Sequence, residues 1–180
     1  GYEAKKLGLE LGGKNPTIIM DDANLDLALE GVLFGAFGTT GQRCTAASRV
    51  ILHKNIKNEF ENKLLKQTEK LKLGDPLKES TDIGPLIAKR AVEKTHTYTE
   101  IGRKEGARLI TGGSPLKGKG FFYKPTIFTH VKPSMRIAQE EIFGPTVSLL
   151  VANDLQEAIH IANNIDYGLS SSIYTSNVNK

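Results

Sequence analysis

Residues 15–53 read NPTIIMDDANLDLALEGVLFGAFGTTGQRCTAASRVILH, and this stretch decides the fold. The apolar run at 15–20 has the length and β-branched content of a short buried strand. Asn24 can cap a helix that continues to Phe37, because the apolar residues that follow it recur at helical spacing. A second apolar run at 49–53 predicts the next strand. A strand, a helix and a strand in succession are typical of an α/β domain.

The rest of the chain continues this alternation. The pattern first predicts an amphipathic helix that stops at 74–76 and has an apolar stripe of Ile56, Phe60, Leu64 and Leu71. It then predicts a helix at 87–106, a strand at 108–111, an extended segment at 125–131, a strand at 146–152, a helix capped by Asp154, and a last strand at 170–175. We therefore predict an α/β fold with a largely parallel sheet.

The composition indicates one globular domain. Apolar residues make up 39% and charged residues 24% of the 180 residues, which is ordinary globular usage. No apolar run approaches 18 residues and no secretory signal is present, so we expect neither a membrane span nor export. The net charge of +4 comes from scattered lysines, which gives little support to nucleic-acid binding. The single cysteine fits a reducing compartment, and we expect the cytoplasm.

Two residues are candidates for catalysis. Glu10 lies between Leu9 and Leu11 and is followed closely by two glycines, so we expect its carboxylate either to be desolvated, which favours proton acceptance, or to point into a cleft. Cys44 has no disulfide partner in the chain and lies in a turn rich in glycine and threonine, where backbone N–H groups and Arg43 can stabilise a thiolate. Taken alone, the cysteine can equally be a small buried hydrophobic residue and the glutamate a structural ion-pair partner.

Three other kinds of site fail on residue chemistry. The stretch 8–14 has the glycine and lysine positions of a phosphate-binding loop, but Asn15 replaces the serine or threonine that should bind magnesium, and a strand follows where a helix is needed. No G-x-S-x-G nucleophile elbow is present. A zinc site lacks ligands at useful spacing, because four histidines lie far apart: His53, His96, His130 and His160.

Three motifs resemble those of the NAD(P)-dependent aldehyde dehydrogenase superfamily. LELGGKNP at 9–16 is similar to the family's glutamate signature, GQRCT at 41–45 to its cysteine signature, and EEIFGP at 140–145 to its cofactor-contacting segment. They occur in the family's order and at its customary spacing, and the resemblance extends over essentially the whole chain. It implies a three-layer α/β/α catalytic domain.

The resemblance also implies a mechanism. The family's cysteine, matched by Cys44, attacks an aldehyde to form a thiohemiacetal, and hydride transfer to NAD or NADP leaves a thioester. The family's glutamate, matched by Glu10, activates the water that hydrolyses the thioester. In the family the match of Glu141 binds the nicotinamide ribose and that of Phe143 packs alongside, and the resemblance places Leu11 in the same cofactor-binding set.

The chain departs from the full family pattern by omission. It has no glycine-rich turn to seat a pyrophosphate, so we expect residues 1–180 to be a partial catalytic domain without the dinucleotide-binding domain and the C-terminal end. We expect the full-length enzyme to be a homo-oligomer acting on a small aldehyde, and this chain alone to be inactive. A cofactor-independent thiol esterase and an inert folded fragment stay open as alternatives. The matched motifs name neither the aldehyde nor the choice between NAD and NADP.

Overall fold

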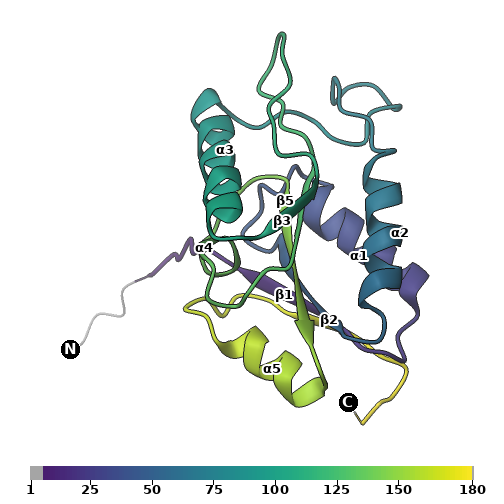
Figure 1. Cartoon of the computed structure of the whole chain (residues 1–180). Helices are drawn as coiled ribbons and strands as arrows, with labels where there is room; N and C mark the ends of the chain where they lie inside the picture. The colour runs from purple at the N-terminus through teal and green to yellow at the C-terminus, as the bar shows by residue number, and fades with distance from the viewer. Residues whose placement is uncertain (1–5, 180) are drawn as a thin grey trace, which may run out of the picture.

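The computed structural model describes residues 6–179 of the chain (Figure 1). In chain order its elements are β1 (Asn15–Ile19), α1 (Leu25–Phe37), β2 (Ala47–His53), α2 (Lys57–Thr68), α3 (Lys89–Lys104), β3 (Arg108–Thr111), β4 (Thr126–Thr129), α4 (Arg136–Gln139), β5 (Thr146–Ala152), α5 (Leu155–Asn163) and β6 (Ser172–Tyr174). No helix among the described residues is long and apolar enough to cross a membrane.

The strands form one six-stranded sheet over the described part of the chain. Their order is β3-β4-β5-β2-β1-β6. Every neighbouring pair is parallel except β3 and β4, which are antiparallel. The predicted α/β fold with a largely parallel sheet is therefore confirmed.

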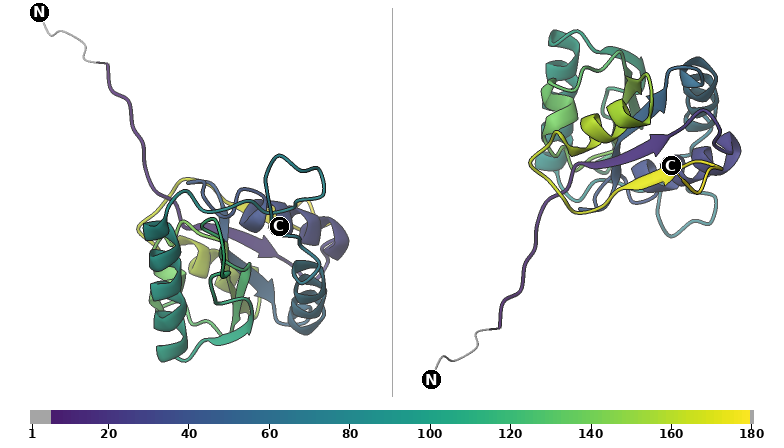
Figure 2. Two further views of the ribbon diagram at one scale, coloured as in Figure 1. Left: turned by 90° about the horizontal axis from the view of Figure 1, so that it is seen from above. Right: turned by 90° about the horizontal axis from the view of Figure 1, so that it is seen from below.

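Helices cover both faces of this sheet, so the fold has three layers (Figure 2). Residues of α1 and α2 pack on one face in a cluster with Val50, Leu52 and Leu149. Residues of α4 and α5, with Tyr98 of α3, pack on the other face with Ile51 and Leu150. Neighbouring residues of β2 and β5 thus point to opposite faces and both are buried, as expected for a parallel sheet covered on both sides.

Local signals set several of the boundaries as predicted. The Asn24 side chain accepts hydrogen bonds from the backbone N–H groups of Asp26 and Leu27 and caps α1. The Asp154 side chain accepts one from Glu157 and caps α5.

One helix end and one short helix differ from the predictions. The second helix was expected to run through Leu71, but α2 ends at Thr68. Leu71 still packs on the core, although it does so from a turn in which its N–H bonds the Thr68 carbonyl. The apolar spacing therefore correctly identified Leu71 as a residue that packs on the core, but the prediction that its backbone is helical was wrong. The short helix α4 was not predicted, because four residues are too few to reveal a helical period.

The sheet order places the three sequence motifs together. The motif at 9–16 runs into the start of β1, and the motifs at 41–45 and 140–145 lie just before β2 and β5; these three strands are neighbours in the sheet. Because these strands are parallel, their amino ends meet at the same edge. The candidate site is therefore built at that edge.

Candidate active site

A cleft of about 560 Å³ opens at the amino ends of these strands. Its lining includes all five residues that the sequence singled out, namely Glu10, Leu11, Cys44, Glu141 and Phe143, together with Gly12, Gln42, Arg43 and Thr45. The fold thus brings together residues separated by up to 133 positions, from Glu10 to Phe143. Cys44 is half-buried there and is a free thiol.

The cysteine turn is held by the side chain of Asn15. Its Nδ2 donates hydrogen bonds to the carbonyl oxygen of Cys44 at 2.7 Å and to that of Ala46 at 2.9 Å. Its Oδ1 accepts one from the backbone N–H of Ser170 at 3.2 Å. Asn15 is buried, so these bonds have little competition from water. The first motif therefore fixes the backbone that carries Cys44 of the second.

The first motif also holds Glu141. The backbone N–H of Gly13 donates to Glu141 Oε1 at 2.8 Å. A Cβ atom at Gly12 would lie 2.9 Å from Glu141 Oε2, and one at Gly13 would clash with the Cys44 carbonyl oxygen. Glycine is therefore required at position 13, where the neighbouring atom is backbone, whereas a Cβ atom at position 12 would displace the Glu141 carboxylate.

The second and third motifs meet directly as well. A Cβ atom at Gly41 would clash with the carbonyl oxygen of Gly144, and Gly41 has a φ of +66°. Two non-glycine residues beside this contact, Thr40 and Phe143, also have positive φ values of 58° and 60°. Such conformations cost of order 1–2 kcal/mol each and tend to occur at functional sites. Each of the three motifs thus contacts the other two.

A fourth segment, residues 84–87, supports the cysteine turn. Gln42 Oε1 accepts a hydrogen bond from the Ile87 N–H at 2.8 Å, and Gln42 Nε2 donates to the Pro85 carbonyl at 3.4 Å. Thr40 Oγ1 donates to the Gly84 carbonyl at 3.2 Å. The turn is therefore tied down on the side away from Asn15.

The two adjacent glutamates of the third motif have different surroundings. Glu140 accepts hydrogen bonds from Arg136 Nε and from the Tyr98 hydroxyl, both at 2.6 Å. The Arg136 hydrogen bond, followed by that of Tyr98, lowers the pKa of Glu140 to about 2. Glu141 is the one that faces the cleft and binds Gly13.

The surroundings of Glu10 differ from the prediction. Glu10 is exposed, and its neighbours Leu9 and Leu11 are 66% and 63% exposed. They lie in the exposed segment 6–11, which has no regular secondary structure, and from there the chain extends away from the sheet toward its N-terminus (Figure 2). The expectation that two leucines desolvate this carboxylate is therefore wrong for this chain, because apolar neighbours in sequence exclude water only when they pack against something.

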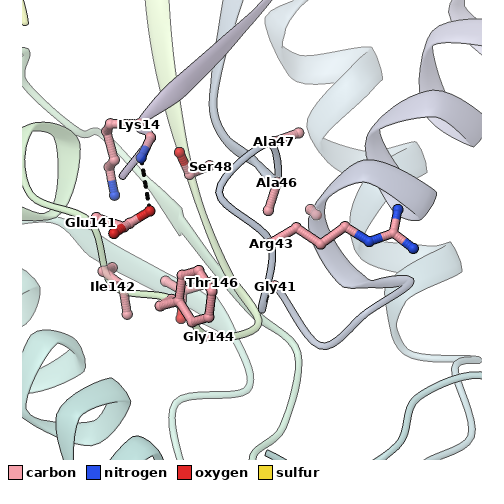
Figure 3. Close-up of a pocket in the computed structure, with 13 residues that line it drawn as sticks. Lys14, Gly41, Arg43, Ala46, Ala47, Ser48, Glu141, Ile142, Gly144 and Thr146 are labelled. Atoms are coloured by element: carbon pink, nitrogen blue, oxygen red, sulfur yellow. Dashed lines mark hydrogen bonds between the residues drawn. The ribbon is translucent and has the colours of Figure 1, made fainter. Parts of the chain in front are cut away.

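The expected role of Arg43 is also not seen. Its guanidinium carbon lies 5.8 Å from the centroid of the Phe34 ring, and the side chain extends toward α1 (Figure 3). This is a cation–π contact at the surface. Arg43 therefore does not direct its charge at the cysteine sulfur.

Two buried cations lie behind the cleft. Arg49 is 1% exposed and donates three hydrogen bonds, to the carbonyl oxygens of Lys14, Ile161 and Ala162. Burial lowers the pKa of Arg49 to about 10. Lys14 is also 1% exposed. Burial, followed by the charge of Arg49, lowers the pKa of Lys14 to about 7.

Sequence reasoning passed over Asn15, Gln42 and Arg49 as functional residues. A signal for the first two existed, because both lie inside motifs whose other members were selected. Nothing local distinguishes Arg49, which looks like the polar start of a strand. Residues 6–179 contain no group of three or more His, Cys, Asp or Glu side chains that could hold a metal ion.

The whole chain matches a known family. Residues 1–180 match the family model described as Aldehyde dehydrogenase family. The chain is 46% identical, over 97% of its length, to the alpha-ketoglutaric semialdehyde dehydrogenase of Bacillus subtilis, and 43% identical, over 99%, to the betaine aldehyde dehydrogenase of Brucella anthropi. It spans 37% of the length of each of these curated relatives.

Solved structures agree. A betaine aldehyde dehydrogenase from Staphylococcus aureus, in complex with NAD+, superimposes with a TM-score of 0.92 at 38% identity, over 94% of this chain and 34% of that one. An aldehyde dehydrogenase from Bacillus cereus gives a TM-score of 0.92 at 42% identity, over 94% of this chain and 35% of that one.

Proposed function

Because this chain belongs to the aldehyde dehydrogenase family, we propose that its cleft carries out the covalent chemistry of NAD(P)-dependent oxidation of an aldehyde to a carboxylic acid. One observation carries the proposal: the three motifs, far apart in sequence, contact one another around a single cleft. The contacts are the Asn15–Cys44 and Gly13–Glu141 hydrogen bonds and the close approach of Gly41 to Gly144. A structural cysteine would not need its backbone held so closely beside a carboxylate that faces solvent.

In this proposal Cys44 is the nucleophile. Its thiolate sulfur forms a bond to the aldehyde carbon, and the carbonyl electron pair moves to oxygen to give a thiohemiacetal. Loss of hydride from that carbon restores the carbonyl and leaves a thioester on Cys44. The fixed Cys44 backbone limits the positions that the sulfur can adopt, which favours attack in one geometry.

The cleft has the features needed to hold the nicotinamide end of a cofactor. Glu141 Oε1 is occupied by the Gly13 N–H, while glycine at position 12 leaves the approach to Oε2 free of a Cβ atom. A carboxylate oxygen is a good acceptor for ribose hydroxyls, and the exposed Phe143 ring and Leu11 offer apolar surface beside it. When bound, the cofactor supplies the hydride acceptor. The S. aureus relative was solved in complex with NAD+, which supports a nicotinamide cofactor for this cleft, NAD or NADP.

Glu10 is proposed to act after acylation. It takes a proton from the water whose oxygen attacks the thioester carbon, and the sulfur of Cys44 then leaves as the acid forms. Because Glu10 is exposed here and the cleft is open, we propose that the 180 residues alone do not turn over aldehyde. A site that excludes water strengthens the interactions needed at the transition state.

Three further features extend the proposal. A half-buried free thiol works only where it stays reduced, which supports the cytoplasm. Exposed Leu27 and Phe34 on α1 offer apolar surface, which supports a homo-oligomer. We propose a partial catalytic domain over 1–180, with an aldehyde as its small-molecule partner, in agreement with its 37% share of the relatives' length.

The test is a chimera in which these 180 residues replace the matching part of the B. subtilis relative. We expect NADH formation with aldehyde in the chimera, none in its Cys44→Ala variant, and one round of hydride transfer with a trapped thioester in its Glu10→Gln variant, read by absorbance and intact mass. The 180-residue chain, assayed in parallel, should form no NADH. A folded chimera that forms no NADH, and whose Glu10→Gln variant carries no acyl group on Cys44 after aldehyde and cofactor are added, would overturn the proposal. Multiple turnover of an activated ester by the chain alone would favour the esterase alternative.

A further inference from the structure

A small cavity lined by both polar and apolar residues adjoins the cleft, and Glu141 lines both (Figure 3). Its volume is about 20 Å³. Four buried side-chain polar atoms have no hydrogen-bond partner among the described protein groups, and three of them belong to residues that line this cavity: Lys14 Nζ, Ser48 Oγ and Thr146 Oγ1. The fourth, Thr68 Oγ1, belongs to a different part of the molecule. Such clustering points to a common partner.

The charges around the cavity restrict what this partner can be. Lys14 carries the cationic group, Arg49 adds a second buried cation, and Lys94 adds a more distant one. Glu141 and Glu140 act in the opposite direction and favour the protonated form of Lys14. A metal cation would be repelled by the two buried cations. The carboxylate of Glu141 in the wall disfavours an anion.

The size of the cavity restricts the partner further. A cavity needs about 10–15 Å³ on this measure to hold one water molecule, and this cavity exceeds that value only slightly. A dry cavity would leave an ammonium group and two hydroxyl groups unpaired, each at a cost of about 1–3 kcal/mol or more. Dry cavities in proteins are lined by apolar groups.

We propose that this cavity is the binding site of a single ordered water molecule, which accepts a hydrogen bond from the Lys14 ammonium group and joins it to the hydroxyl groups of Ser48 and Thr146. Three polar partners are the usual number for a buried water. Glu141 lines both this cavity and the cleft, so the proposed water site adjoins the residue whose carboxylate faces the cleft. The significance of that position for cofactor binding rests on the proposed function, whereas the water site does not.

The proposal is tested on the 180-residue chain by an NMR titration of the Lys14 side chain, with lysine labelled at Cε and Nζ. The water solvates the charged form, so the double variant Ser48→Ala, Thr146→Val should lower the pKa of Lys14 by about one further pH unit. The matched control is Thr68→Val, which removes the fourth unpaired hydroxyl and should leave the titration of Lys14 unchanged. Equal behaviour of the double variant and the control would overturn the proposal.

A crystal structure of the unmodified chain gives a second, independent measurement. We expect density for one water molecule at about 2.7–3.2 Å from Lys14 Nζ, Ser48 Oγ and Thr146 Oγ1. An empty cavity, or a Lys14 ammonium group paired directly with Glu141, would refute the site even if the variants fail to fold. Neither measurement uses aldehyde or nucleotide, so failure of the water site and failure of the dehydrogenase proposal are distinguishable.

Discussion

The side-chain amide of Asn15 donates a hydrogen bond to the carbonyl oxygen of Cys44 at 2.7 Å, and so joins the first residue of β1 to the residue proposed as nucleophile. The same amide reaches Ala46, and its oxygen accepts from Ser170. One buried side chain thus links three segments that approach the amino ends of neighbouring strands. We therefore expect the conformation of the thiol turn to depend on this residue.

Asn15→Asp tests this dependence with almost no change in volume. The aspartate replaces a donor with an acceptor that faces the carbonyl oxygens of Cys44 and Ala46. We expect a loss of about 2–4 kcal/mol in the free energy of unfolding, measured in urea. We also expect a changed rate of alkylation of Cys44, followed by intact mass. The control Asn62→Asp makes the same replacement at an exposed position of α2 and should alter neither quantity. A stable Asn15→Asp variant with an unchanged alkylation rate would show that the turn holds itself.

Gly13→Ala tests the close packing of the motifs. A methyl group at this position clashes with the Cys44 carbonyl oxygen, and the same backbone donates to Glu141, so one shift disturbs both contacts. We expect a destabilisation of about 2 kcal/mol or more. Gly8→Ala is the matched control, because nothing lies within 4 Å of its added Cβ atom and it also lacks a positive φ. Equal unfolding midpoints for the two variants would contradict the packing described here.

Arg49→Lys tests the clamp between the first motif and α5. Arginine reaches three carbonyl oxygens from separate nitrogens, two of them at the carboxyl end of α5, whereas a lysine ammonium group cannot span them all. We expect a loss of about 2 kcal/mol. Arg90→Lys, at an exposed position, should have no effect on the urea midpoint. If Arg49→Lys matches Arg90→Lys, the three hydrogen bonds contribute no net stability.

The strands, the helix caps and the motifs could be predicted because each depends on local pattern. Asn24 and Asp154 cap helices through residues two or three positions away, which a sequence shows directly. The adjacency of β5, β2 and β1 could not be predicted in this way, since β2 and β5 are separated by five other elements. The sequence therefore identified Cys44 and Glu141 as candidates without showing that Gly13 and Asn15 pack against them.

Burial was the property that sequence pattern estimated least well. Leu9 and Leu11 suggested a desolvated Glu10, yet nothing in the described structure covers them, and all three are exposed. Lys14 is the opposite case, because it is charged and yet only 1% exposed. It directly precedes β1, which is an inner strand of a sheet covered on both faces. Tertiary packing decides both cases, and neither is encoded in the immediate neighbours.

The burial of Lys14 should make the stability of the chain depend on pH in a definite direction. The pKa of Lys14 falls from an ordinary value of 10.5 to about 7 in the folded chain. Between these two values the unfolded chain holds a proton that the folded chain has released, so the free energy of unfolding rises with pH. Lys14→Met removes this contribution while keeping an unbranched side chain. We therefore expect the stability of the unmodified chain, relative to Lys14→Met, to increase by about 2 kcal/mol between pH 7 and pH 9, measured by urea unfolding at each pH.

Arg49 does not disturb this pH window, since its pKa is lowered only to about 10. Lys66→Met, at an exposed site on α2, serves as the control and should give a curve parallel to that of the unmodified chain. If the stability of Lys14→Met also changes with pH in parallel with that of the unmodified chain, the Lys14 ammonium group is equally well solvated in the folded and unfolded chains. Lys14 would then not be the buried cation beside Glu141.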